Sequence, residues 1–185
     1  YDYDGRYQGV FPIKCNQQRH VVEHLVDRGQ RWSFGLEAGS KAELLIALAL
    51  IEDQQALLIC NGYKDRRYIE TAILARRLGH QPMVVIEQAD EVDRIIEASE
   101  ALGASPFLGI RAKLSSRSTG RWGSSVGARA KFGLDLTEML QTVQALERAG
   151  LLKDLRLLHF HIGSQINDIA VLKDALQEAG QIYVE

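Results

Sequence analysis

Short apolar runs alternate with amphipathic stretches along nearly the whole chain. Each run is followed by a polar turn and then by apolar residues at helical spacing. Six runs are predicted strands, at 8–15, 32–37, 56–61, 83–87, 107–113 and 155–163. Because a helix is expected after each strand, the order βαβα predicts a parallel sheet with helical crossovers, which is an α/β fold.

The predicted helix ends carry recognisable signals. Ser40 and Glu43 form a capping-box pattern ahead of an apolar stretch, and Asp65 and Asp90 are predicted caps of the next two helices. Four glycines stand where left-handed helix ends favour a residue without Cβ: Gly29, Gly79, Gly103 and Gly150.

The residues that end the strands recur at nearly fixed intervals. Lys14, Glu37, Asn61, Glu87 and Arg111 lie 23, 24, 26 and 24 positions apart in turn. This regularity predicts a closed (β/α) barrel, in which carboxyl strand ends converge on one mouth. No glycine-rich phosphate motif of a doubly wound sheet occurs. Six units fall short of the eight of a complete barrel, so we expect a fragment or an open barrel.

The last predicted strand end is His161, which follows Arg111 by 50 positions because a long polar segment is inserted between them. A barrel would bring its imidazole to the same mouth as the five earlier strand ends. Six polar side chains from six strands are therefore expected to face a common space.

Composition and charge exclude several classes of protein. The 185 residues, with 46% hydrophobic and 25% charged residues, predict one globular domain over 1–185. A net charge of −2 gives no reason to expect nucleic acid or an anionic membrane as partner. The longest apolar run, 44–51, is too short to span a bilayer, so a cytoplasmic location is expected. Cys15 and Cys60 lack CxxC spacing and are predicted to be reduced thiols.

Lys14 is the residue with the clearest candidate chemistry. An apolar strand that ends in a lone lysine presents an amine at a barrel mouth. Burial disfavours the ammonium form, and a deprotonated amine attacks an aldehyde to form a Schiff base. The alternative is a lysine whose charged head extends from a strand end into solvent.

Four motifs carry a family resemblance that extends over essentially the whole chain. They are Val10-Phe11-Pro12-Ile13-Lys14-Cys15-Asn16-Gln17-Gln18, Gly35-Leu36-Glu37-Ala38-Gly39-Ser40-Lys41-Ala42-Glu43-Leu44, Lys131-Phe132-Gly133-Leu134 and His159-Phe160-His161-Ile162-Gly163-Ser164-Gln165. In this order they resemble the motifs of biosynthetic arginine decarboxylases, in the fold-type III pyridoxal-phosphate group. That group also holds ornithine and diaminopimelate decarboxylases and alanine racemase.

The resemblance implies a role for six residues. Lys14 is implied to hold pyridoxal phosphate as a Schiff base, and His161 to pack against the cofactor ring. Gly163 and Ser164 are implied to lie beside the phosphate. Arg111 would approach the phenolic oxygen, and Glu37, near the lysine, would favour its ammonium form and orient it.

Several of these roles have alternatives in the sequence itself. Arg111 is also compatible with a surface or salt-bridging arginine, and Glu37 with a charge that complements a helix dipole. His159 is interpreted as a structural residue one layer below His161. A rival hypothesis takes the two histidines as a metal pair of an amidohydrolase-like barrel, although no further ligand set completes it.

The segment 113–131 has five basic residues and no acidic ones, and three functions are considered for it. It could close as a lid over the barrel mouth and exclude water. It could instead be a phosphate or nucleic-acid patch, for which one tryptophan and a neutral chain give little support. A solvated basic loop is the third interpretation.

The resemblance implies decarboxylation of L-arginine to agmatine and CO2 in polyamine biosynthesis. It implies a homo-oligomer for the full-length protein, leaves room for Mg2+, and places a C-terminal β domain outside this chain. Because the glycine-rich phosphate loop and the carboxylate partner of the cofactor ring nitrogen are also missing, we expect the isolated chain to be inactive. The alternatives are a pyridoxal-phosphate-binding barrel without decarboxylase activity and a decarboxylase for ornithine or diaminopimelate.

Overall fold

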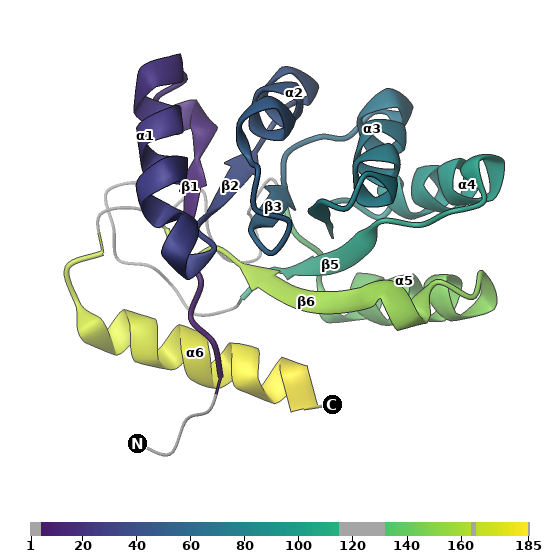
Figure 1. Cartoon of the computed structure of the whole chain (residues 1–185). Coiled ribbons are helices and arrows are strands. Elements are labelled where there is room, and N and C mark those ends of the chain that lie inside the picture. The colour runs from purple at the N-terminus through teal and green to yellow at the C-terminus, as the bar shows by residue number, and fades with distance from the viewer. Residues whose placement is uncertain (1–4, 115–131, 164–165, 185) are drawn as a thin grey trace. The chain divides into compact units, whose positions relative to one another are not determined.

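A computed structural model describes residues 5–114, 132–163 and 166–184 as a run of βα units (Figure 1). The strands are β1 (Val10–Pro12), β2 (Gly35–Ala38), β3 (Leu57–Cys60), β4 (Gln81–Ile86), β5 (Phe107–Ala112) and β6 (Leu155–Phe160). The helices are α1 (Arg19–Gly29), α2 (Lys41–Leu50), α3 (Arg66–Arg77), α4 (Glu91–Leu102), α5 (Leu136–Arg148) and α6 (Ile169–Val184). Short 3-10 turns are η1 (Ile13–Cys15), η2 (Gln30–Trp32) and η4 (Leu152–Asp154).

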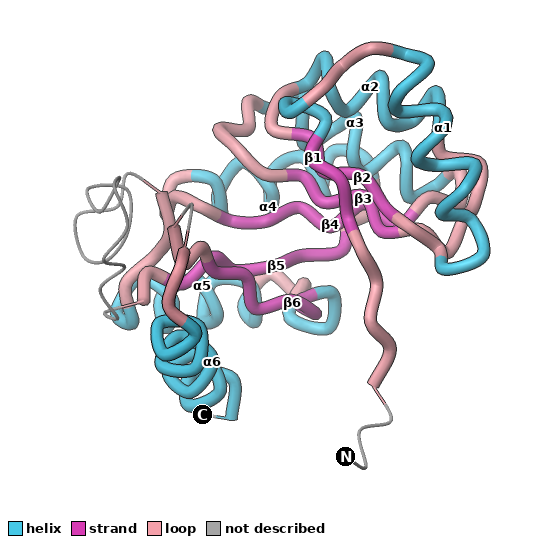
Figure 2. The backbone as a smooth tube through the Cα atoms, turned by 90° about the vertical axis from the view of Figure 1, so that its left-hand side faces the viewer, coloured by secondary structure: helices cyan, strands magenta, loops and turns pink. Residues whose placement is uncertain are grey.

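The sheet confirms the predicted fold class. Its strand order is β1-β2-β3-β4-β5-β6, and Figure 2 labels these strands along the backbone. The pairings of β1 with β2, β2 with β3, β3 with β4, and β5 with β6 are parallel. Each strand is followed by a helix, as the alternating pattern predicts. Within the described residues the sheet has six strands, fewer than the eight of a complete barrel, and β1 and β6 are the outer strands of the order.

The chain divides into two compact units. The first comprises residues 1–84 and 97–107, and the second comprises residues 85–96 and 108–185. In the first unit α1, α2 and α3 lie side by side along the strands β1 to β3 (Figure 1). In the second unit α6 packs against β6.

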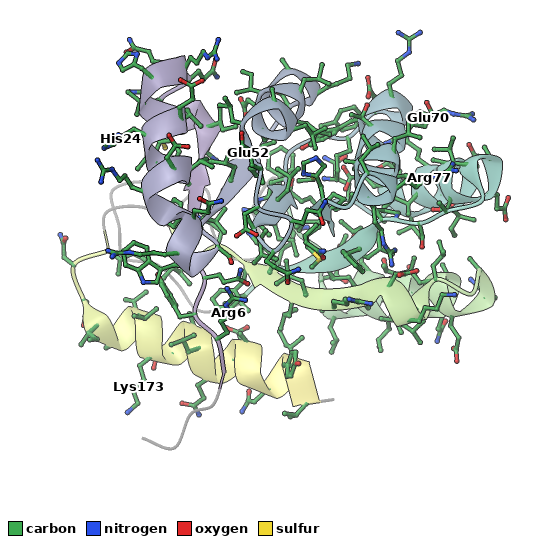
Figure 3. The ribbon with its side chains drawn as sticks, in the orientation of Figure 1. Arg6, His24, Glu52, Glu70, Arg77 and Lys173 are labelled. Atoms are coloured by element: carbon green, nitrogen blue, oxygen red, sulfur yellow. The ribbon has the colours of Figure 1, made fainter. Side chains whose placement is uncertain are left out.

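Each unit buries apolar side chains from its strands and from the inner faces of its helices. The fully buried residues of the first unit include Leu36, Leu44, Leu58, Ile69 and Ile73. Those of the second unit include Ile86, Ile95, Leu108 and Leu134. Exposed polar side chains lie on other faces of the helices, as Figure 3 shows for His24 on α1 and Lys173 on α6.

The predicted helix ends are mostly confirmed. Ser40 accepts a hydrogen bond from the Glu43 backbone N–H, and Asp65 accepts one from the Tyr68 N–H. Gly79, Gly103 and Gly150 have positive φ angles, as expected at left-handed helix ends.

Two predictions near the second strand are wrong. Gly29 has a helical φ of −81°, and its lack of Cβ serves packing instead, because a Cβ there would lie 2.4 Å from the Phe34 Cβ. Trp32 belongs to η2 rather than to β2, which begins at Gly35 after the left-handed Ser33. The predicted strand begins too early because Trp32 is apolar and is therefore counted as part of the strand.

A close approach of two backbones requires glycine at position 35. A Cβ at Gly35 would lie 2.2 Å from the carbonyl oxygen of Leu57 in β3. Gly180 is an exposed residue within α6. A Cβ at Gly180 would have no atom within 4 Å apart from its chain neighbours and the nearby backbone of its own helix. The two positions therefore differ in steric demand and form a matched pair.

We expect Gly35→Ala to lower the free energy of unfolding by about 1–3 kcal/mol, since the β2–β3 pair must separate to admit the methyl group. Gly180→Ala should raise it by about 0.5–1 kcal/mol, because alanine loses less backbone entropy in a helix. Urea unfolding followed by circular dichroism measures both. Equal stabilities of the two variants would contradict this account of the β2–β3 contact.

Candidate functional site

The end of β1 and the end of β2 bring a lysine and a carboxylate together in the first unit. The parallel register pairs Pro12 with Glu37, and Lys14 follows Pro12 by two residues. The Lys14 Nζ donates a hydrogen bond to the Glu37 Oε1 at 3.2 Å. The Lys14 side chain is 63% exposed and that of Glu37 is 20% exposed. This amine is thus positioned by one carboxylate and is open to an incoming reactant.

The structure places Lys14 outside the predicted strand, and its exposed side chain agrees with the alternative of a charged head that extends into solvent. The strand ends at Pro12, and Lys14 lies in the 3-10 turn η1, closed by a hydrogen bond from the Asn16 N–H to the Ile13 carbonyl. Proline has no N–H to donate, which limits the length of the strand. The exposed side chain also lacks the desolvation expected from burial, so the described residues act on this amine mainly through Glu37.

Glu43 joins the segments that carry these two residues. Its carboxylate accepts a hydrogen bond of 2.7 Å from the Gly39 N–H, directly after β2. The Gln17 Nε2, just after η1, donates to the other carboxylate oxygen at 3.5 Å. Because Glu43 stands in the first turn of α2, this rigid helix helps to fix both strand ends.

A network that sequence reasoning missed supports the end of β3. The Tyr68 hydroxyl donates to the carbonyls of Ala38 at 2.7 Å and Asn61 at 3.4 Å. Lys64 is fully buried, and its Nζ donates to the Gly62 carbonyl at 2.5 Å. Lysine is rarely buried, and nothing in the spacing of the turn 61–65 distinguishes Lys64 from a surface residue.

Asn61 presents a polar atom at this strand end. Its side chain is buried, and its Oδ1 has no hydrogen-bond partner among the residues that the structure describes. Its backbone N–H is bonded to the Ala38 carbonyl at 2.9 Å, which fixes the position of the carboxamide beside the end of β2. Such an acceptor is suited to a donor on a bound ligand.

In the second unit, the ends of β4 and β5 form another ion pair. The Arg111 Nη1 donates to the Glu87 Oε1. Glu87 is 1% exposed and Arg111 is 16% exposed, so this pair is far more buried than that of Lys14 and Glu37. The Phe132 ring centroid lies 6.0 Å from the Arg111 guanidinium carbon. The predicted strand-end positions of Glu87 and Arg111 are thereby brought into direct contact.

The residues after β6 are only partly described. His159 is half-buried within β6, and His161 is exposed directly after it. Gly163 has a positive φ of 107°, a conformation that favours glycine and lets a ligand approach the backbone. Ser164, which the resemblance implies to lie beside the phosphate, and most of the basic segment 113–131 lie outside the described residues.

The described residues hold no group of three or more His, Cys, Asp and Glu side chains that could bind a metal ion. The metal-pair hypothesis for His159 and His161 therefore gains no support from this part of the chain. Within the same residues, no helix is both long and apolar enough to cross a membrane.

A parallel βα chain that presents an accessible lysine amine beside a carboxylate has the groups that a barrel needs to bind an aldehyde cofactor through an amine. Comparison with known families defines the class of protein. Residues 2–185 match the model of the pyridoxal binding domain of pyridoxal-dependent decarboxylases. The chain belongs to this family, and the resemblance predicted from its motifs is confirmed.

Individual relatives agree with the family. The biosynthetic arginine decarboxylases of Parasynechococcus marenigrum (strain WH8102) and Prochlorococcus marinus (strain MIT 9303) are 80% and 76% identical to the chain over all 185 residues. The chain spans 29% and 28% of their lengths. The crystal structure of the Campylobacter jejuni biosynthetic arginine decarboxylase superposes with a TM-score of 0.86 at 39% identity, covering 98% of this chain and 28% of that one.

A more distant solved structure shares the fold. Diaminopimelate decarboxylase from Helicobacter pylori superposes with a TM-score of 0.78 at 23% identity, covering 98% of this chain and 44% of that one. The parallel βα arrangement is thus common to decarboxylases of different names.

Both cysteines are free thiols, as predicted, but their surroundings differ. Burial raises the pKa of the Cys60 thiol to about 12, whereas Cys15, next to Lys14, is exposed. Since the thiolate is the reactive form, Cys60 should be inert at neutral pH.

We expect Ellman's reagent at pH 8 to modify one thiol per folded chain rapidly and the second only after unfolding. Cys15→Ser should abolish the rapid phase, and Cys60→Ser should leave it unchanged. A rapid reaction that survives Cys15→Ser would contradict the burial of Cys60.

Proposed function

We propose that the protein carrying this chain is a pyridoxal-phosphate-dependent decarboxylase of L-arginine, and that this chain supplies the lysine that holds the cofactor. The amine of Lys14, fixed by Glu37 at neighbouring strand ends, is the observation that carries the proposal. The names of the close relatives support arginine as the substrate and agmatine and CO2 as the products.

The residues present suit the cofactor. Lys14 offers an accessible primary amine for its aldehyde, and Arg111 offers a cation for one of its anionic oxygens. Gly163 has the backbone conformation suited to a phosphate contact, and the Asn61 Oδ1 is an available acceptor. Pyridoxal phosphate, when bound, supplies a conjugated ring that accepts the electron pair left by loss of CO2.

Lys14 and Glu37 control the protonation of the Lys14 amine in this proposal. The Lys14 Nζ must lose a proton before it can attack a carbonyl carbon, and its exposure lets that proton pass to water. The Glu37 Oε1, at 3.2 Å, orients the amine and receives a hydrogen bond from it. After decarboxylation the same amine would return a proton to the product.

Other parts of the site remain predictions. His161 is proposed to pack against the cofactor ring, and Gly163 and Ser164 are proposed to line the phosphate. The spacing of the strand ends supports a common mouth formed by all six of them, and the short longest apolar run supports a cytoplasmic location. The resemblance of the motifs supports homo-oligomerisation of the full-length protein and leaves room for Mg2+.

The test uses the protein that carries this chain, purified and titrated with pyridoxal phosphate. A visible absorbance band of lysine-bound cofactor should form in the parent protein and be absent in Lys14→Ala. Release of CO2 from arginine should fall about a thousandfold or more in that variant. Lys41→Ala, which removes an exposed lysine paired with Asp65, is the matched control and should retain both signals.

An unchanged band in Lys14→Ala would refute the role of Lys14. Cofactor binding without CO2 release would favour a binding barrel, and faster release from ornithine or diaminopimelate would correct the substrate.

A further inference from the structure

We infer that Glu87 is a positioning residue: its carboxylate holds the guanidinium of Arg111 so that the other donors of Arg111 are available to an anionic oxygen of the bound cofactor. The inference rests on the proposed function and extends it to a residue outside the four motifs.

The guanidinium of Arg111 has donors for two partners, the Glu87 carboxylate and a ligand. An arginine side chain has five N–H donors in a rigid planar fork. The Nη1 donates to Glu87, and no other acceptor for this guanidinium is found among the described residues. The Arg111 side chain is 16% exposed and is therefore not sealed from a ligand, and we assign its remaining donors to that contact.

A backbone clamp holds both members of the pair at their strand ends. The Gly133 N–H donates to the Glu87 carbonyl at 2.9 Å, and the Leu134 N–H donates to the Arg111 carbonyl at 2.7 Å. Gly133 has a φ of 104°, and a Cβ there would lie 3.3 Å from the Arg111 carbonyl oxygen. The segment after the basic insertion thus fixes the backbone on both sides of the ion pair.

The burial of Glu87 indicates a role beyond stability. Removing a carboxylate from water is costly, and a buried ion pair often stabilises a fold no better than apolar residues of the same size. Such a pair does fix the orientation of its partner, because the fork must align with the carboxylate. A guanidinium at the end of β5 that must meet a planar cofactor benefits from that alignment.

The competing explanation is that Glu87 only stabilises the fold. The chain offers a matched control for a purely structural role. Asp154 is a buried carboxylate of the same unit, in η4 at the amino end of β6. Because Glu87 and Arg111 lie at carboxyl strand ends, loss of Asp154 should disturb the fold without changing the groups proposed to meet the cofactor.

The experiment measures the dissociation constant of pyridoxal phosphate by absorbance, and the melting temperature, in the protein that carries this chain. The variants are Glu87→Gln, Arg111→Gln, their double variant and Asp154→Asn. We expect Glu87→Gln and Arg111→Gln each to weaken cofactor binding about tenfold, and the double variant to be no weaker than either, since they act as one unit. Asp154→Asn should lower the melting temperature and leave the dissociation constant unchanged.

Wild-type affinity in Glu87→Gln would overturn the inference, as would wild-type affinity in Arg111→Gln or fully additive losses in the double variant. If Glu87→Gln fails to fold, Glu87→Asp keeps the charge and withdraws the carboxylate by one methylene group. Its affinity should then be reduced, and unchanged affinity would overturn the inference. A Lys14→Ala variant that keeps its visible band would instead refute the proposed function and this inference with it.

Discussion

Parallel backbone pairing between successive strands is the constraint on which the described sites depend. A parallel strand pair places residues one βα unit apart beside each other, and ion pairs among the described residues have this separation. Lys14 pairs with Glu37 across 23 positions, whereas Lys41 with Asp65 and Glu87 with Arg111 are each separated by 24. The repeat length of the chain therefore determines which charges meet, before any pocket is considered.

The two strand-end pairs have different physical consequences. An exposed pair such as Lys14 with Glu37 contributes at most about 1 kcal/mol to stability, so its main effect is to orient an amine. Glu87 and Arg111 are buried, and removing one partner would leave an uncompensated charge at a cost of about 3–5 kcal/mol. The first pair can open to admit a reactant, whereas the second is suited to hold a fixed orientation.

The sequence predicts the elements and their order well, because apolar runs and helical periodicity report directly on burial. The regular spacing of strand ends likewise predicts which residues reach the carboxyl edge of each unit, including Glu37 and Arg111. The spacing does not predict the environment of Lys14. The strand β1 ends at Pro12, and Lys14 lies in the 3-10 turn that follows, where its side chain is exposed. The partners of Tyr68 and Lys64 were also missed, since hydrogen bonds to backbone carbonyls leave no periodic signal.

That missed network explains how a strand end can stay ordered next to an exposed amine. The Tyr68 hydroxyl, on α3, binds the Ala38 carbonyl one residue after Glu37, and the Gly62 backbone approaches Gly39 so closely that a Cβ would lie 2.3 Å from the Gly39 oxygen. The Tyr68 hydroxyl is a second donor to the Ala38 carbonyl, which also accepts the Asn61 N–H at 2.9 Å, and the close Gly62–Gly39 approach packs the two backbones together. The strand end that carries the Glu37 carboxylate is thus held by hydrogen bonds to its backbone, so an exposed amine is combined with a firmly placed acceptor.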